Sequence, residues 1–377
     1  MSACGFSHLG GIFVLLLEID YYGGRGELVA SGEVAANMKF MIRSLQSLRG
    51  VAAIMIVALH FGFHSGMVES FGDCAVAIFM MLSGFVLSLG YHDRVAGGYG
   101  IPFRNFMLKR IIRIVPLYLL GLFYSLALCH FHISPSKFIA DVLMLQSWIP
   151  SPDYYFSGNA PTWFVSDLML CYLLFIPTIT LLNRRPGLFA GLFSLYIIAY
   201  ILCVAFIPDA LVHPIVYIFP PMQFPVFVVG MVLAKVYSEW RVKLSGFRAD
   251  LVLVFIIALI VCQMWFYPSV SPRLSLSVYW WFGVAGLIVS LSLCHKCRMI
   301  KLLSTLPLVT LGNMSYALYI FHIPFQNTWH IICRHLGLTL PLNADFVIFT
   351  ILAITGAVVV HNVVEKPLTR KLDSILG

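Results

Sequence analysis

Ten apolar stretches, each long enough to cross a lipid bilayer, constrain this 377-residue chain more than any other feature. A helix that spans a membrane needs about 17–25 predominantly apolar residues. The stretches that reach this length are residues 45–64, 72–91, 111–131, 163–182, 188–207, 214–237, 250–267, 278–294, 306–326 and 344–364. Hydrophobic residues make up 60% of the chain and charged residues 11%, a composition that excludes a soluble domain of this length. We therefore predict an all-α fold, a polytopic membrane helix bundle of about ten transmembrane helices.

The charges between these stretches predict how the bundle is oriented. Lys and Arg concentrate in every second connection, and the connections that hold them are residues 92–110, 183–187, 235–249 and 295–301. Connections rich in Lys and Arg face the cytoplasm, so we expect both termini on the cytoplasmic side. The net charge of +8 is mostly accounted for by this topology, and we expect no nucleic-acid partner.

Arg49 and His60 lie in the first stretch, within the run SLRGVAAIMIVALHFGF, where a charged or titratable side chain is costly. The helix between them rises roughly 16 Å and completes nearly a whole number of turns. Both side chains are therefore expected on one helix face, with Arg49 near one end and His60 deeper. That face is predicted to line a cavity or a packed interior.

The cysteine and histidine patterns predict no metal site. The nine cysteines are irregularly spaced and mostly lie in apolar segments, which argues against a disulfide framework or a zinc site, and we expect them to be reduced. His60 and His64 have the i, i+4 spacing of a helical metal pair, but no Glu follows His60 and no third ligand is evident.

Residues 1–40 differ from the rest of the chain. The run GIFVLLLEIDYYGG has a short apolar core interrupted by two acidic residues, with no basic region before it, so it is a poor signal peptide. Two interpretations stay open: a mis-assigned start, with synthesis beginning at Met38 or Met41, or an amphipathic surface segment. We expect an N-terminal extension over residues 1–40 and a ten-helix domain over 41–377.

Five motifs between about Leu45 and Leu372 resemble those of the acyltransferase-3 family of integral membrane O-acyltransferases. They are the pair formed by Arg49 and His60, FMMLSGFV at 79–86, KRIIRIVP at 109–116, LGNMSY at 311–316 followed by Tyr319, His322 and Pro324, and EKP at 365–367. The chain departs from the family after Trp163, where many members carry a Glu and this sequence offers only Asp167, displaced by about one position. Asp167 is therefore left out of the predicted site.

The resemblance implies a stand-alone enzyme without the hydrolase-like domain that some relatives append. It implies transfer of an acyl group, with acetyl favoured, from acyl-CoA to a hydroxyl group of a cell-envelope polysaccharide or lipid-linked glycan. Acetyl-CoA or another acyl-CoA is then a donor substrate, and no permanently bound cofactor is expected. The expected partners are acyl-CoA, the glycan or glycolipid acceptor and membrane lipid, and the expected location is the bacterial inner membrane.

The polar residues near the cytoplasmic half suit this chemistry. Attack of a hydroxyl on a thioester needs a base, and imidazole titrates near neutral pH, so we predict His60 as the base and place Arg49 with it in the catalytic group. Guanidinium groups bind phosphates, so Arg110 and Arg113 are predicted to bind the nucleotide end of the donor. The alternatives are that Arg110 and Arg113 anchor the helix at the membrane surface and that His60 is a packing histidine.

A second polar group consists of Ser315, Tyr316, Tyr319 and His322, of which the first, third and fourth share one helix face. These residues are predicted to line the acceptor side and stabilise an oxyanion, or else to make polar contacts between helices. The aromatic run QSWIPSPDYYFSGNAPTW, residues 146–163, is expected on the outer side as an interface belt or a sugar entrance.

Two other functions fit parts of the sequence. A transporter or flippase of glycan or acyl groups also needs charges inside the membrane, but no internal repeat or paired broken helices accompany them here. Acylation of a small secreted metabolite is the other alternative. We favour O-acylation of a glycan.

Overall fold

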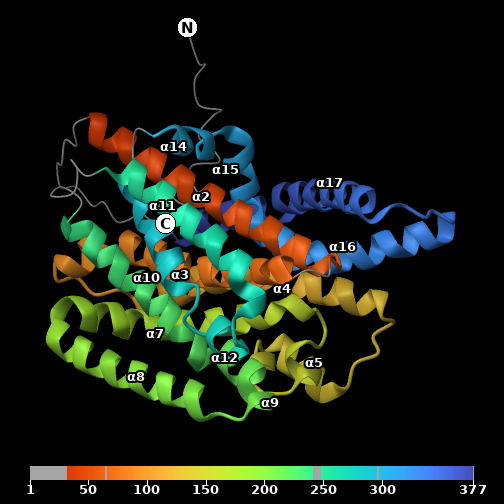
Figure 1. Ribbon diagram of the computed structural model, residues 1–377, viewed down its shortest axis with the longest axis horizontal. Helices are drawn as coiled ribbons and strands as arrows, with labels where there is room; N and C mark the ends of the chain where they lie inside the picture. Colours follow the sequence, from red (N-terminus) through yellow and green to blue (C-terminus); the bar gives the residue numbers. More distant parts are fainter. Residues whose placement is uncertain (1–31, 64–65, 241–247, 295–296, 377) are drawn as a thin grey trace, which may run out of the picture.

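The computed structural model describes residues 32–63, 66–240, 248–294 and 297–376, which form helices joined by short connections, with no strand among them (Figure 1). Residues 1–31 of the predicted N-terminal extension lie outside this range, and residues 32–40 form the first turns of the first described helix. The all-α fold class is confirmed.

Eight helices or helical stretches in the described ranges are long and apolar enough to cross a membrane. They contain α2 (Gly32–His60), α3 (Gly66–Ala96), α4 (Phe103–Leu128), α7 (Trp163–Arg184), α8 (Pro186–Phe206), α10 (Pro220–Trp240), α11 (Ala249–Phe266) and α17 (Leu342–Val360). A bent pair, α15 (Leu306–Asn313) and α16 (Ser315–Leu336), meets at 68° and is long and apolar enough for a ninth crossing if both helices form one span. The predicted stretch 278–294 corresponds to a shorter apolar helix, α13 (Trp281–Leu293).

Short helices connect these long ones. The α-helical connectors are α5 (Pro135–Val142), α6 (Pro152–Tyr155), α9 (Asp209–Leu211), α12 (Pro272–Ser275) and α14 (Arg298–Leu303). The last described helix is α18 (Lys366–Leu376). Segments Gln146–Trp148, Ala160–Thr162 and Tyr267–Ser269 are 3₁₀ turns, while Val212–Tyr217 and His361–Glu365 are π-helical.

Proline and glycine set several of the helix boundaries. Pro186 opens α8 and Pro135 opens α5, where the missing N–H of proline costs nothing because the first turn has no internal acceptor for it. Gly337 follows α16 with φ of 62°, the left-handed conformation that commonly ends a helix.

Helix α3 lies at the centre of the bundle, packed against α2 and α10, with α7 and α8 on one side and α2, α16 and α17 on the other (Figure 1). Its contact with α10 depends on two glycines: a Cβ at Gly84 would overlap the carbonyl oxygen of Phe227, and one at Gly230 would overlap that of Met81. Small residues of this kind let helices in a membrane approach backbone to backbone. Gly84 of the FMMLSGFV motif thus lies at a packed helix crossing.

A second close approach joins the first helix to the broken one. Gly50 of α2 and Gly312 of α15 face each other, and a Cβ at Gly312 would overlap the carbonyl oxygen of Gln46. The α15 segment therefore lies against α2 beside Arg49, and the chain bends after Asn313 to start α16 at Ser315. The second polar group lies on α16, which begins directly after this bend and also packs against the first helix.

The connection between α4 and α7 is held by buried polar groups. Asp141 of α5 accepts a hydrogen bond from Ser157 at 3.1 Å, and its backbone oxygen accepts one from Tyr118 at 2.6 Å. Gly158 has φ of 59°, and a Cβ there would lie 2.6 Å from the second carboxyl oxygen of Asp141. Burial raises the pKa of Asp141 to about 7, partly offset by the hydrogen bond from Ser157.

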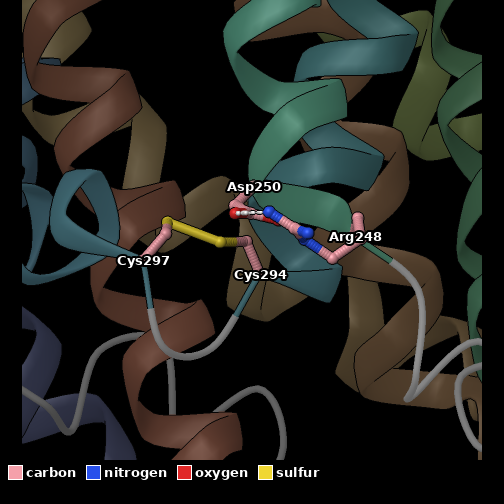
Figure 2. A network of polar contacts seen from close by, with 4 residues as sticks. All are labelled: Arg248, Asp250, Cys294 and Cys297. Carbon is pink, nitrogen blue, oxygen red and sulfur yellow. Dashed lines mark hydrogen bonds and ion pairs between the residues drawn. A yellow bond between two sulfur atoms is a disulfide. The ribbon is translucent and has the colours of Figure 1, made fainter.

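Two of the nine cysteines depart from expectation. Cys294 and Cys297 form a disulfide at the end of α13, near the start of α11, where Arg248 pairs with Asp250 (Figure 2). The expectation that all nine cysteines are reduced is therefore wrong for these two, whose Cα atoms are 6.2 Å apart. These two cysteines are three positions apart, and the spacings of the other seven are irregular, so the sequence alone did not predict this pair.

Candidate active site

A cavity of about 90 Å³ opens between α2, α3, α4, α7 and α16. It brings together six of the eight predicted site residues, which are Arg49, Arg110, Arg113, Ser315, Tyr316 and Tyr319. The two others, His60 and His322, do not line it and instead contact each other. Residues from four of the five motifs, all except EKP at 365–367, thus meet in space although they are far apart in the chain.

The position of Arg110 in this cavity is set by aromatic rings. Its guanidinium carbon lies 5.4 Å from the ring centre of Phe106, one turn earlier on α4, and 5.8 Å from that of Tyr172 on α7. Arg110 is 6% exposed, so these cation–π contacts are made away from solvent, where they are stronger. The charge is held at the cavity wall by packing on two helices.

Arg113 lies one turn further along α4, and Arg49 faces the same cavity from α2. No Asp or Glu occurs among the described residues that line the cavity. Three guanidinium groups inside a bundle of membrane helices carry a large desolvation cost. Guanidinium groups bind phosphate esters through bidentate, charge-assisted hydrogen bonds, so this set of side chains suits a phosphate-bearing ligand.

Ser315, the first residue of α16, also faces the cavity. It is 1% exposed, and its hydroxyl oxygen has no hydrogen-bond partner among the described residues. Buried hydroxyl groups are nearly always hydrogen-bonded. An unsatisfied hydroxyl beside three arginines therefore indicates a ligand-binding cavity.

The two tyrosine hydroxyls are already used. Tyr316 donates to the backbone oxygen of Ile114 at 2.8 Å, and Tyr319 donates to that of Pro161. Both bonds join α16 to other elements, as the alternative of polar contacts between helices predicts. Their rings, and not their hydroxyl groups, are what the cavity presents.

The rings of Phe79, Phe164 and Tyr319 meet at the end of the cavity away from the arginines. All three pairs are in contact, with ring centres 6.2 Å apart for Phe79 and Phe164, 6.1 Å for Phe79 and Tyr319, and 5.9 Å for Phe164 and Tyr319. We call these residues the three-ring cluster. Tyr319 also contacts His322, with ring centres 6.1 Å apart, so the cluster adjoins both the cavity and the histidine pair.

His60 and His322 form a pair of imidazoles beside the three-ring cluster, with their ring planes inclined by 48°. Nε2 of His322 is 3.2 Å from Nδ1 of His60, and the ring centres are 5.0 Å apart. Nδ1 of His60 also lies 2.9 Å from the backbone oxygen of Ile56, and Nδ1 of His322 lies 2.7 Å from that of Tyr319. His322 is 1% exposed, whereas His60 is half-buried.

Gln326 completes this arrangement by donating to the backbone oxygen of His60 at 3.0 Å. His322 and Gln326 are four residues apart on α16, so one helix face contacts both the ring and the backbone of His60. The sequence interpretation had placed His322 on the acceptor side and had not singled out Gln326. Gln326 could have been found from the sequence, because it is a polar residue four positions after His322 in an apolar helix.

Other residues that the sequence analysis considered lie elsewhere. Asp167 is fully buried in α7 and is not among the residues lining the cavity. Glu365 is also buried and forms an ion pair with His361 at 2.8 Å, one turn earlier. Within the described ranges, no group of three His, Cys, Asp or Glu side chains is placed to hold a metal ion.

The aromatic run 146–163 packs mostly against the helix ends. Tyr155 contacts His213 with ring centres 5.9 Å apart, and Trp163 contacts Tyr217 at 5.1 Å. Trp163 also touches Phe164 of the three-ring cluster at 6.1 Å. A continuous series of rings thus leads from this connection to the histidine pair.

Comparison with known proteins gives one family and two relatives. The model of the acyltransferase-3 family, described as an acyltransferase domain, matches residues 42–362. "Acyltransferase MdmB" of Streptomyces mycarofaciens is 24% identical, over 87% of this chain and 92% of its own length. "Putative peptidoglycan O-acetyltransferase YrhL" of Bacillus subtilis (strain 168) is 22% identical over 75% of this chain. The matched region covers 48% of the length of that protein. No solved structure matches the chain significantly.

Proposed function

This chain belongs to the acyltransferase-3 family of membrane O-acyltransferases, and on that basis we propose that it moves an acyl group, with acetyl favoured, from acyl-CoA to a hydroxyl group of a cell-envelope glycan. The observation that carries the proposal is the cavity in which Arg49, Arg110 and Arg113 meet beside the unsatisfied hydroxyl of Ser315. Positive charge and apolar walls in one cavity suit a ligand with phosphates at one end and a neutral arm at the other.

The arginines support a coenzyme A donor that enters from the cytoplasm. Arg110 ends the basic connection 92–110, which the charge distribution assigns to the cytoplasmic side, and Arg113 follows it by three residues. Their guanidinium groups are suited to bidentate binding of the nucleotide phosphates. The apolar remainder of the cavity, lined by residues such as Leu82, Val86 and Leu168, suits the pantetheine arm.

The chemical step uses His60 as the base. Its imidazole takes the proton of the acceptor hydroxyl as that oxygen attacks the thioester carbonyl carbon. The carbon–sulfur bond then breaks, the electron pair goes to sulfur, and the imidazolium returns its proton to the departing coenzyme A thiolate. For this step the thioester has to pass the three-ring cluster, which adjoins both the cavity and the histidine pair.

The acceptor is proposed to approach from the outer side of a bacterial inner membrane. His60 ends α2 on the side away from the arginines, and the aromatic run 146–163 leads from there toward solvent. Aromatic faces of this kind also stack against sugar rings. The relative named as a putative peptidoglycan O-acetyltransferase supports a glycan acceptor.

Acetyl-CoA binding to the purified protein tests the donor assignment. The double variant R110A/R113A should bind acetyl-CoA about tenfold more weakly or worse, since each charge-assisted hydrogen bond contributes about 1.5–3 kcal/mol. H60A should bind it as wild type does. Isothermal titration calorimetry in detergent micelles measures both, with R185A as the control because Arg185 is exposed at the start of α8. Equal affinities for the double variant and wild type would contradict the donor site.

A further inference from the structure

We propose that His322 is a positioning residue that fixes the tautomer of His60, so that the base presents an unprotonated Nε2 to the acceptor hydroxyl. The inference rests on the proposed function, because it assumes that His60 is the base. Its structural basis is the 3.2 Å contact between Nε2 of His322 and Nδ1 of His60, together with the backbone oxygens that each ring faces.

The proton positions follow from which atoms can only accept. The backbone oxygen of Tyr319 lies 2.7 Å from Nδ1 of His322, so this nitrogen carries the proton and Nε2 of the same ring has a lone pair. Nδ1 of His60 faces the backbone oxygen of Ile56 at 2.9 Å and the lone pair of His322 at 3.2 Å. Both of these neighbours are acceptors, so Nδ1 of His60 carries the proton.

A neutral imidazole has one protonated nitrogen, so Nε2 of His60 is left with the lone pair. This is the nitrogen that can remove a proton from a hydroxyl group. The opposite tautomer would place an unprotonated Nδ1 against two acceptors, which is unfavourable for both contacts. The pairing with His322 therefore selects the reactive form before any substrate binds.

The same contacts suit the protonated state of the base. Once Nε2 of His60 has taken the proton, its Nδ1–H still donates to the oxygen of Ile56 and to His322, so no side chain has to move during the reaction. Gln326 fixes the backbone at the same point by donating to the oxygen of His60 at 3.0 Å. His322 holds the base, and the backbone holds His322. Catalytic bases in other enzymes are oriented by a further residue in the same way.

Two substitutions of similar size and polarity separate positioning from packing. The amide of Gln reaches roughly the place of Nε2 of the imidazole, so H322Q retains an acceptor for His60. The amide of Asn reaches only the place of Nδ1, so H322N keeps a polar side chain but loses that acceptor. H330N, on the exposed face of the same helix, is the control.

The assay uses inverted membrane vesicles that contain each variant, radiolabelled acetyl-CoA as the donor, and the vesicles' own glycan as the acceptor. We expect H322N to lower the maximal rate of acetyl transfer about 10–100-fold, with KM for acetyl-CoA within about twofold of wild type. The loss is smaller than the roughly 100- to 10,000-fold that general acid–base catalysis contributes, because the base is still present. H322Q should restore most of the rate, and H330N should match wild type.

The possible results distinguish failure of the role of His322 from failure of the proposed acyl transfer. Equal losses in H322N and H322Q, or a rise in KM with an unchanged maximal rate, would overturn the positioning role while wild-type transfer upholds the proposed function. An absence of transfer by the wild-type chain would overturn the proposed donor or acceptor, and the inference with it.

Discussion

At the scale of single residues, the site combines a charged cavity with a titratable pair that lies outside it. Arg110 is held by two aromatic rings on different helices, and His60 is held by a histidine and a glutamine on a third. Arg110 and His60 are thus each held partly by an element other than their own. This explains why their partners depend on the folded bundle.

Asp141 gives a prediction on pH and stability. Burial raises its pKa to about 7, so between pH 4 and pH 7 the folded protein retains a proton that the unfolded chain releases. Stability from this group is fully present near pH 4 and is lost as the pH rises through 7. D141N, which resembles the protonated acid, should therefore stabilise the protein at pH 8 by up to a few kcal/mol and change it little at pH 4.

Thermal unfolding in detergent micelles at the two pH values measures this effect. D153N is the matched control, because Asp153 is exposed in the same connection. A D141N variant that is less stable than wild type at pH 8 would show that the ionised carboxylate is the form the fold prefers.

At the scale of helices, close crossings without side chains between them hold the centre of the bundle. Gly84 and Gly230 let α3 and α10 touch at the backbone, and Gly50 and Gly312 do the same for α2 and α15. Ser83, next to Gly84, lines the cavity, so the crossing of α3 and α10 also positions one cavity wall. Packing and site geometry are therefore linked through α3.

G230A tests this link. A methyl group there overlaps the backbone of Met81, and overpacking of a well-packed contact costs about 1–3 kcal/mol. We expect a lower unfolding temperature and a lower yield of folded protein. G191A in α8, where a Cβ meets nothing within 4 Å, should behave like wild type. Unchanged thermal stability of G230A would mean that α3 and α10 can separate without cost.

The three-ring cluster gives a second prediction at this scale. Phe164 packs with Phe79 and Tyr319 where the cavity adjoins the histidine pair, so F164A should admit water to the bound thioester and raise hydrolysis of acetyl-CoA in the absence of acceptor several-fold. Release of free thiol, followed with a thiol reagent, measures it. F282A is the control, because Phe282 is 71% exposed on α13. A hydrolysis rate equal to that of wild type would argue that the cluster excludes no water.

Much of the helical framework could be predicted from the sequence, because membrane-length apolar runs leave few alternatives to a helix. The predicted stretch 306–326 is divided by the bend after Asn313, where α15 packs against α2. Six of the eight predicted site residues meet in one cavity; helical spacing predicts which neighbours share a face, as for Arg110 and Arg113, but the meeting of α2, α4 and α16 is tertiary. The contact of His60 with His322, 262 positions away, is tertiary and no local pattern contains it.

At the scale of the whole molecule, the eight long crossings, the bent pair and α13 together account for the ten predicted stretches in the described parts of the chain. The arginines line the cavity, the histidine pair lies outside it, and the three-ring cluster adjoins both the cavity and the pair. A multi-pass membrane protein with this arrangement can receive a donor from one side and an acceptor from the other. We propose that it does so to acylate an envelope glycan, with His60 as the base.

The most direct test is mass spectrometry of the cell-surface polysaccharide from a deletion strain that carries an empty plasmid, the wild-type gene or H60A. Protein levels are matched by immunoblotting. The account predicts that an O-acyl mass increment disappears on deletion, returns with the wild-type gene and fails to return with H60A. A glycan that is unchanged by deletion would contradict the acceptor and direct the search to secreted metabolites, and full restoration by H60A would contradict the assignment of His60 as the base.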